Sequence, residues 1–114
     1  MLEELFGSKN RERVLQYILA NNQGYAKEIA DFYESSVDPI QKQLERLELG
    51  SILVSQTVGR TRLFMFNPRY AFKNELEALL LKAREFYAPD EIERLTKQRK
   101  RSSKEASTKR DKMG

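Results

Sequence analysis

Apolar side chains recur at helical spacing through the first half of the chain, and polar breaks divide them into three segments. In the first segment Val14 and Ile18 share one face, and Ser8 is suited to cap the helix. The break before the second segment ends at Gly24, a residue able to adopt positive φ. The pattern therefore predicts three helices, at about residues 8–21, 25–33 and 37–49.

The start of the third helix has two interpretations. Ser36 could be the N-cap with Pro39 at the third helical position, or Asp38 could be the N-cap with Gln41 completing a capping box. Either start leaves Pro39 in a first turn that needs no amide hydrogen. The stripe of Ile40, Leu44 and Leu47 packs inward, so a partner would meet the opposite face, which consists of Asp38, Lys42, Glu45, Arg46 and Leu49 with Gln41 and Gln43 on its flanks.

The next two segments, residues 52–58 and 61–67, are rich in β-branched and aromatic residues. Gly59 and Arg60 lie between them, which predicts a hairpin with a tight, basic tip. The second strand is apolar on both faces, with Leu63 and Met65 on one face and two phenylalanines on the other. We therefore expect both of its faces to be covered.

A long helix is predicted from about Tyr70 to Phe86, with a broad apolar face. After Pro89 the hydrophobic content falls. A helix over residues 90–101 would use only Ile92 and Leu95, and residues 102–114 have no apolar period, so disorder is expected there. The chain is thus divided into one domain, residues 1–88, and a basic, partly helical to disordered tail, residues 89–114.

Charge is unevenly distributed along the 114 residues, whose net charge is +4. Residues 1–89 carry twelve basic and twelve acidic side chains, while residues 90–114 carry nine basic and five acidic ones. Within residues 1–89, no acidic residue lies between Glu48 and Glu75, whereas the basic residues Arg60 and Arg62 both lie there. The hairpin is therefore a basic patch on a neutral domain.

Composition argues against most enzyme chemistry. The chain has neither cysteine nor histidine, so a thiolate or imidazole metal site, a thiol nucleophile and a histidine base are all excluded. No phosphate-binding glycine loop is present. We expect a binding protein with no catalytic residue, no metal and no cofactor.

The apolar runs bear on localisation. They reach four residues at most, far short of the roughly 20 that cross a bilayer. The start of the chain is acidic, where a secretory signal would be basic. We therefore expect a soluble cytoplasmic protein without a membrane partner.

The predicted order of elements, α-α-α-β-β-α, is that of a mainly α winged helix-turn-helix with a small antiparallel hairpin, and three stretches carry a resemblance to a family. Residues 5–9, Leu-Phe-Gly-Ser-Lys, lead into the first helix. Residues 40–48, Ile-Gln-Lys-Gln-Leu-Glu-Arg-Leu-Glu, look like a recognition helix, and residues 52–68 look like a wing. Over residues 5–87 the chain resembles the ArsR-like transcriptional regulators. Metal sensors of that family use Cys and His ligands, so metal response does not carry over.

The resemblance implies a sequence-specific regulator that binds double-stranded DNA, with the third helix in the major groove and the wing on backbone or minor groove. Lys42 and Arg46 suit phosphates or guanine edges, glutamines suit adenine, and the wing arginines suit phosphates or a narrow minor groove. The candidate DNA-binding residues are Tyr25, Lys27, Ser36, Gln41, Lys42, Gln43, Arg46, Arg60, Thr61 and Arg62.

The apolar surface near the two ends of the domain is broader than one small core needs, which favours a homodimer. The candidate interface residues are Leu2, Leu5, Phe6, Leu76, Leu79, Leu80, Ala83, Phe86 and Tyr87. An alternative function uses the same fold for protein contact, as the partner subunit of a separately encoded protein. The neutral charge of the domain and the acidic residues of the third helix favour this alternative.

Overall fold

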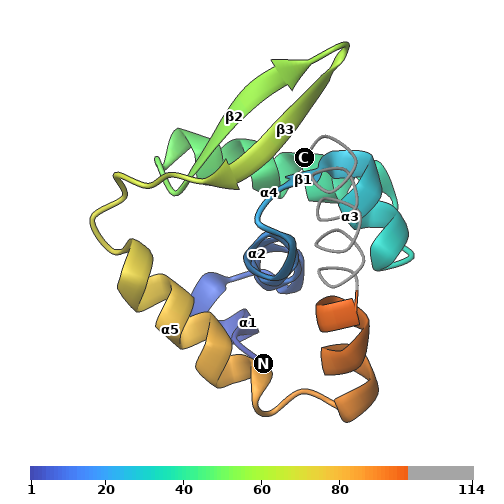
Figure 1. Ribbon diagram of the computed structural model, residues 1–114, viewed down its shortest axis with the longest axis vertical. Helices are drawn as coiled ribbons and strands as arrows, with labels where there is room; N and C mark the ends of the chain where they lie inside the picture. The colour runs from blue at the N-terminus through green and yellow to red at the C-terminus, as the bar shows by residue number, and fades with distance from the viewer. Residues whose placement is uncertain (98–114) are drawn as a thin grey trace, which may run out of the picture.

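A computed structural model describes residues 1–97 of the chain (Figure 1). Residues 98–114, on which the expected disorder and the end of the last predicted helix fall, lie outside the described part. The elements are α1 (Glu3–Phe6), α2 (Lys9–Asn21), β1 (Gly24–Tyr25), α3 (Ala26–Phe32), α4 (Val37–Leu49), β2 (Leu53–Val58), β3 (Thr61–Phe66) and α5 (Lys73–Arg84). Residues 89–97 form a further helix.

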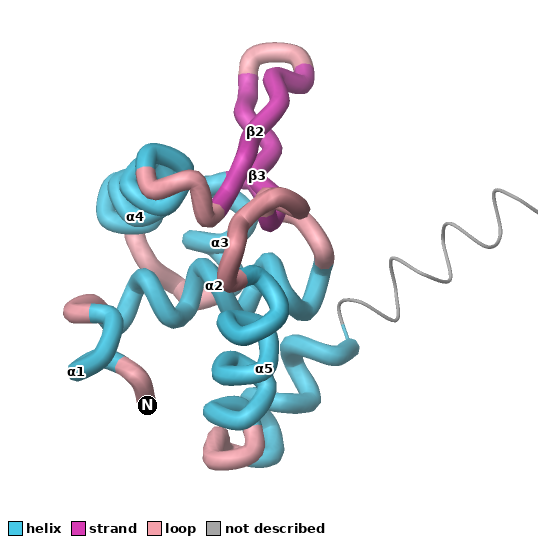
Figure 2. The backbone as a smooth tube through the Cα atoms, turned by 90° about the vertical axis from the view of Figure 1, so that its left-hand side faces the viewer, coloured by secondary structure: helices cyan, strands magenta, loops and turns pink. Residues whose placement is uncertain are grey.

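The predicted hairpin is confirmed, and it gains a third strand. The sheet has the antiparallel order β1-β3-β2, with Val58 opposite Thr61 beside the tip and Gly24 opposite Phe64 at the base. Because β3 lies in the middle, both of its edges are paired, and Leu63 and Phe64 are buried next to each other. Beyond the base, β2 and β3 project from the helices as a ribbon (Figure 2).

The break after α2 differs from the prediction. Asn22 is the residue with positive φ, at 70°, and it ends α2 in the left-handed region. Gly24 is instead a buried strand residue, where an added Cβ would lie 3.0 Å from Cδ1 of Ile29 and 3.1 Å from Cε1 of Tyr17. Glycine is required here by close packing rather than by backbone conformation.

Serine residues occupy the N-cap positions of α2 and α4, but only the first of them forms a side-chain capping bond. Ser8 is the N-cap of α2, and its hydroxyl accepts a hydrogen bond from the Arg11 amide at 3.3 Å. For α4 the interpretation with Ser36 as N-cap is confirmed, which puts Pro39 at the third helical position. The helix predicted from about Tyr70 to Phe86 is shorter than expected, because turns bonded from Tyr70 to Asn67 and from Lys73 to Tyr70 precede α5.

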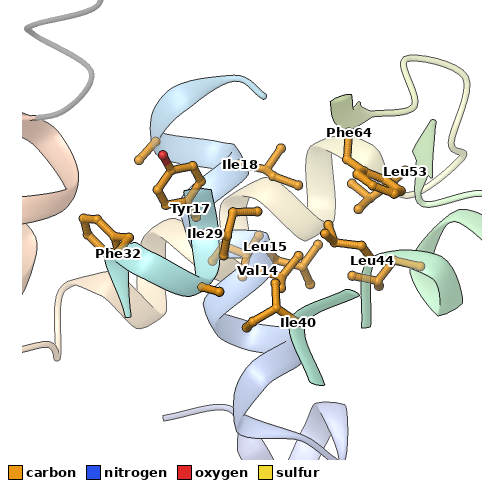
Figure 3. Close-up of a cluster of buried hydrophobic side chains, with 14 of the residues drawn as sticks. Val14, Leu15, Tyr17, Ile18, Ile29, Phe32, Ile40, Leu44, Leu53 and Phe64 are labelled. Carbon is orange, nitrogen blue, oxygen red and sulfur yellow. The ribbon is translucent and has the colours of Figure 1, made fainter. Parts of the chain in front are cut away.

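The core forms around α2, whose buried side chains contact every neighbouring layer (Figure 3). Ile40 and Leu44 reach it from α4, and Leu53 and Phe64 reach it from the sheet. Leu95 of the last described helix is 0% exposed and belongs to the same cluster. The segment after Pro89 therefore contributes to this core.

A candidate nucleic-acid interface on helix α4 and the β2–β3 wing

The outward face of α4 has the orientation that its periodicity predicts. Ile40, Leu44 and Leu47 are buried, and the five residues expected opposite them, namely Asp38, Lys42, Glu45, Arg46 and Leu49, are all exposed. Lys42 and Arg46 lie one turn apart on this face and form no ion pair within residues 1–97. The helix therefore offers two free cations to a partner, beside two carboxylates.

The two flanking glutamines differ from each other. Gln41 lies at the surface, where its amide donates to Oε1 of Glu45 at 3.0 Å. Gln43 was expected to be accessible, and the structure corrects this, since Gln43 is only 8% exposed. Its Oε1 accepts a hydrogen bond from Nε of Arg11 at 2.9 Å. Packing against α2 thus turns Gln43 inward and gives it an internal partner.

The wing turns at Gly59, whose φ of 63° lies in the left-handed region that favours glycine. Arg60 is exposed at this tip. Thr61 is also exposed, and its hydroxyl donates to the Val58 carbonyl at 3.0 Å, which closes the turn. Arg60 is consequently the cation at the turn between β2 and β3, the two strands that project from the helices (Figure 2).

Arg62, in contrast, is held at the side of the wing. Its guanidinium forms an ion pair with Glu48 near the end of α4 and donates to the Ser55 hydroxyl at 2.8 Å. Ser55 donates in turn to the second carboxylate oxygen of Glu48, and the Arg62 guanidinium lies 5.3 Å from the centre of the Phe64 ring. This cluster fixes the wing against α4 and partly neutralises one of the two expected wing cations.

Other predicted residues meet in a surface groove between α3 and the sheet. Tyr25, Lys27 and Thr61 line a hollow of about 750 Å³, together with Glu28 and Asp31. Lys27 is exposed there and Tyr25 is half-buried. Ser36 lies elsewhere, exposed at the start of α4, and its side chain forms no capping bond. Apart from Ser36 and the inward-facing Gln43, the predicted residues therefore occupy three places: the outward face of α4, the wing, and the groove beside α3.

The predicted dimer residues separate into exposed and internal ones. Leu5 is 65% exposed and Phe86 is 63% exposed. Leu80 and Ala83 are buried within this chain, because α5 packs on α2, so they offer no surface to a second copy. The remaining residues are half-buried, namely Leu2, Phe6, Leu76, Leu79 and Tyr87. Sequence reasoning left Leu81 off the interface, although it is exposed on α5.

A buried carboxylate joins two of these half-buried residues. Glu12 on α2 accepts a hydrogen bond from the Leu2 amide at 2.6 Å and another from the Tyr87 hydroxyl. Burial raises the pKa of Tyr87 above its ordinary value, and the bond to Glu12 raises it further. The chain segments before α2 and after α5 are thereby fixed to one side chain.

Within residues 1–97, no three carboxylates are grouped in a way that could hold a metal ion. None of the described helices has the length and apolar character needed to cross a membrane. The site consists of exposed polar and charged side chains, and it has the geometry of a binding surface.

The element order, with a helix-turn-helix formed by α3 and α4 and a β2–β3 wing, defines a winged helix-turn-helix fold. No family model matches the chain, and no curated protein matches it either. Two solved structures of Lactococcus lactis ZitR, both of the C30AH42A mutant, are similar to it at 16% identity. One covers 86% of this chain and 74% of its own, with a TM-score of 0.47. The other, an apo form, covers 91% and 87%, with a TM-score of 0.49.

Proposed function

We propose that this protein is a sequence-specific, DNA-binding transcriptional regulator of the ArsR-like type, whose partner is double-stranded DNA. One observation supports this most strongly. Exposed Lys42 and Arg46 lie on the outward face of α4, and the same fold projects a hairpin with Arg60 at its tip. A helix and a β-ribbon presented together can contact adjacent grooves of one duplex.

In this proposal α4 enters the major groove and the wing follows the backbone or the minor groove. Arg46 and Lys42 contact guanine edges or phosphates, and Gln41 pairs with adenine once it releases Glu45. Arg60 contacts phosphate directly. Arg62 serves mainly to orient the wing, because Glu48 already occupies its guanidinium.

We further propose that the regulator is a homodimer. Leu5 and Phe86 leave large apolar surfaces in water, and Leu81 adds a third on α5. A two-fold dimer would place its recognition helices about 34 Å apart, on half-sites separated by one helical turn. Light scattering on the full chain tests this, and a monomer at micromolar concentration would contradict it.

Selection of bound sequences from random DNA is the decisive experiment. We expect an enriched motif with two-fold symmetry. On that motif, Arg46→Gln should weaken binding by about tenfold, the loss of one charged hydrogen bond of about 1.5 kcal/mol or more. Lys9→Gln is the matched control, since Lys9 is an exposed cation at the start of α2, outside α4 and the wing, and forms no ion pair within residues 1–97.

If the selection enriches no motif and both variants behave alike, the DNA-binding proposal is wrong. The second candidate function, a protein-contact module, would then be favoured. Its support is the mixed charge of the outward face of α4, where Asp38 and Glu45 accompany the two cations, and Leu49, which is 87% exposed on the same helix. Co-purification of one stoichiometric protein without DNA would support that alternative.

A further inference from the structure

A separate cavity of about 260 Å³ lies where α1, α2, α4 and α5 meet. Apolar side chains from all four helices contribute to its wall, as do Ile52 and Tyr70 from the connecting segments. The lining residues are Leu5, Phe6, Arg11, Leu15, Arg46, Leu47, Ile52, Tyr70 and Leu76. The cavity therefore has a largely hydrocarbon interior.

The charged side chains that line the cavity are both positive. Arg11 and Arg46 are its two ionisable groups apart from the Tyr70 phenol, and no carboxylate lines it. Arg11 is held in place, because its Nε donates to Gln43 at 2.9 Å and its Nη1 donates to the Phe6 carbonyl at 3.0 Å. The Arg46 side chain is exposed, and within residues 1–97 its guanidinium forms no hydrogen bond or ion pair. One guanidinium is thus fixed and the other is free to close on a ligand.

The size of the cavity limits its occupant. A hydrocarbon-lined cavity of about 150 Å³ suffices to bind benzene, so this larger one has room for a ring and a short acidic side chain. Guanidinium groups bind carboxylates through paired, charge-assisted hydrogen bonds. From these observations we propose that the cavity is a binding site for a small carboxylic acid with an apolar, ring-sized body, whose carboxylate is held by Arg46 and Arg11.

The position of the site has a consequence that rests on the proposed function. Arg46 cannot bind the carboxylate and a DNA phosphate or base at the same time. Arg11 also links α1, through the Phe6 carbonyl, to Gln43 of α4. Occupation of the cavity is therefore expected to weaken DNA binding, and the acid would act as an inducer.

The site is tested first without DNA, on the full chain, with phenylacetate as the probe. Calorimetry should give a Kd of about 1 mM or tighter, as for a good ligand of this size. The neutral phenylacetamide should bind at least about tenfold more weakly, because it lacks the charge that the guanidinium groups recognise. Methyl chemical shifts of Leu15, Leu47 and Leu76 should change on titration, which locates the probe.

Two variants on the same helix make the test specific. Arg46→Gln should lower phenylacetate affinity about tenfold and leave phenylacetamide binding unchanged. Lys42→Gln should change neither, since Lys42 is exposed on the same helix but does not line the cavity. Both positions are exposed, so both variants should fold.

The proposal is overturned if phenylacetate does not bind, if the acid and the amide bind equally well, or if Arg46→Gln and Lys42→Gln have equal effects. These outcomes are independent of DNA. Failure of the DNA selection would remove the proposed function and leave a binding site, while failure of the titration would remove the site and leave the DNA result intact.

Discussion

Replacement of Leu95 by alanine is expected to lower the free energy of unfolding by about 2–3 kcal/mol. Leu95 is fully buried in the core cluster, although the sequence around it is strongly polar. Its helix, residues 89–97, is anchored beside α3 by Arg94, whose Nη2 donates to the Phe32 carbonyl at 2.6 Å and whose guanidinium lies 4.3 Å from the centre of the Phe32 ring. The leucine thus closes one side of the core.

The magnitude follows from what the substitution removes. Burying a leucine side chain is worth about 1.5–3 kcal/mol, and a rigid cavity would raise the cost of Leu→Ala toward about 5 kcal/mol. The surrounding side chains can relax into part of the space that the leucine leaves, which limits the expected loss to the lower part of this range. For a domain of this size, about 2–3 kcal/mol corresponds to a fall in Tm of roughly 10–20 °C.

Urea denaturation of the full chain, followed by circular dichroism, measures this loss. Leu49→Ala is the matched control, a leucine at the end of α4 that is 87% exposed, and it should cost well under about 1 kcal/mol. A Leu95→Ala loss below about 0.5 kcal/mol would refute the packing argument. Truncation after Ala88 should be at least as destabilising as Leu95→Ala, and an unchanged stability would instead support a domain that ends at residue 88.

Three further outcomes are expected. In gel-shift titrations across salt concentrations, Arg60→Gln should reduce the salt slope by about 0.9, and Arg62→Gln should reduce it less. Glu48→Gln should strengthen DNA binding, because it frees the Arg62 guanidinium. Equal effects of the two arginine variants would contradict the pairing of Arg62 with Glu48. Because its folded-state pKa is raised, Tyr87 contributes stability that is present below about pH 10 and lost as pH rises further, so Tyr87→Phe should flatten the alkaline fall in stability measured by urea titration. Gly24→Ala should lower the thermal midpoint, since overpacking costs about 1–3 kcal/mol, and an unchanged midpoint would mean that Ile29 moves aside at no cost.

The helices and the hairpin could be predicted because their signals are local. The Ser8 cap, the apolar stripe of α4 and the glycine at the wing tip each act within a few residues of chain. The third strand could not be predicted, because β1 has two residues and exists only through its pairing with β3. The burial of Leu95 was missed for a similar reason, since a single leucine in a polar segment produces no period.

In the candidate site, too, the features set by one helix could be predicted and those set by tertiary contacts could not. The exposure of Lys42 and Arg46 follows from 100° per residue along one helix, and the structure agrees. The inward orientation of Gln43 depends on its hydrogen bond with Arg11, which is 32 residues away along the chain. The pairing of Arg62 with Glu48 depends on how the wing sits against the end of α4, and that relation is set by tertiary packing. Sequence periodicity predicts which face a residue lies on, but it does not predict its partner.

Ion pairs within the protein limit the number of cations that the proposed interface can offer to DNA phosphates. With Arg62 paired to Glu48, four of its cations form no ion pair within residues 1–97, namely Lys27, Lys42, Arg46 and Arg60. Four phosphate contacts give a log–log salt slope of about −3.6, and a dimer on two half-sites gives about −7. The slope of a chain truncated after Lys97 therefore distinguishes a monomer with four engaged cations, near about −3.6, from a dimer with eight, near about −7. A slope near zero would show that α4 and the wing do not meet phosphate, whatever the fold.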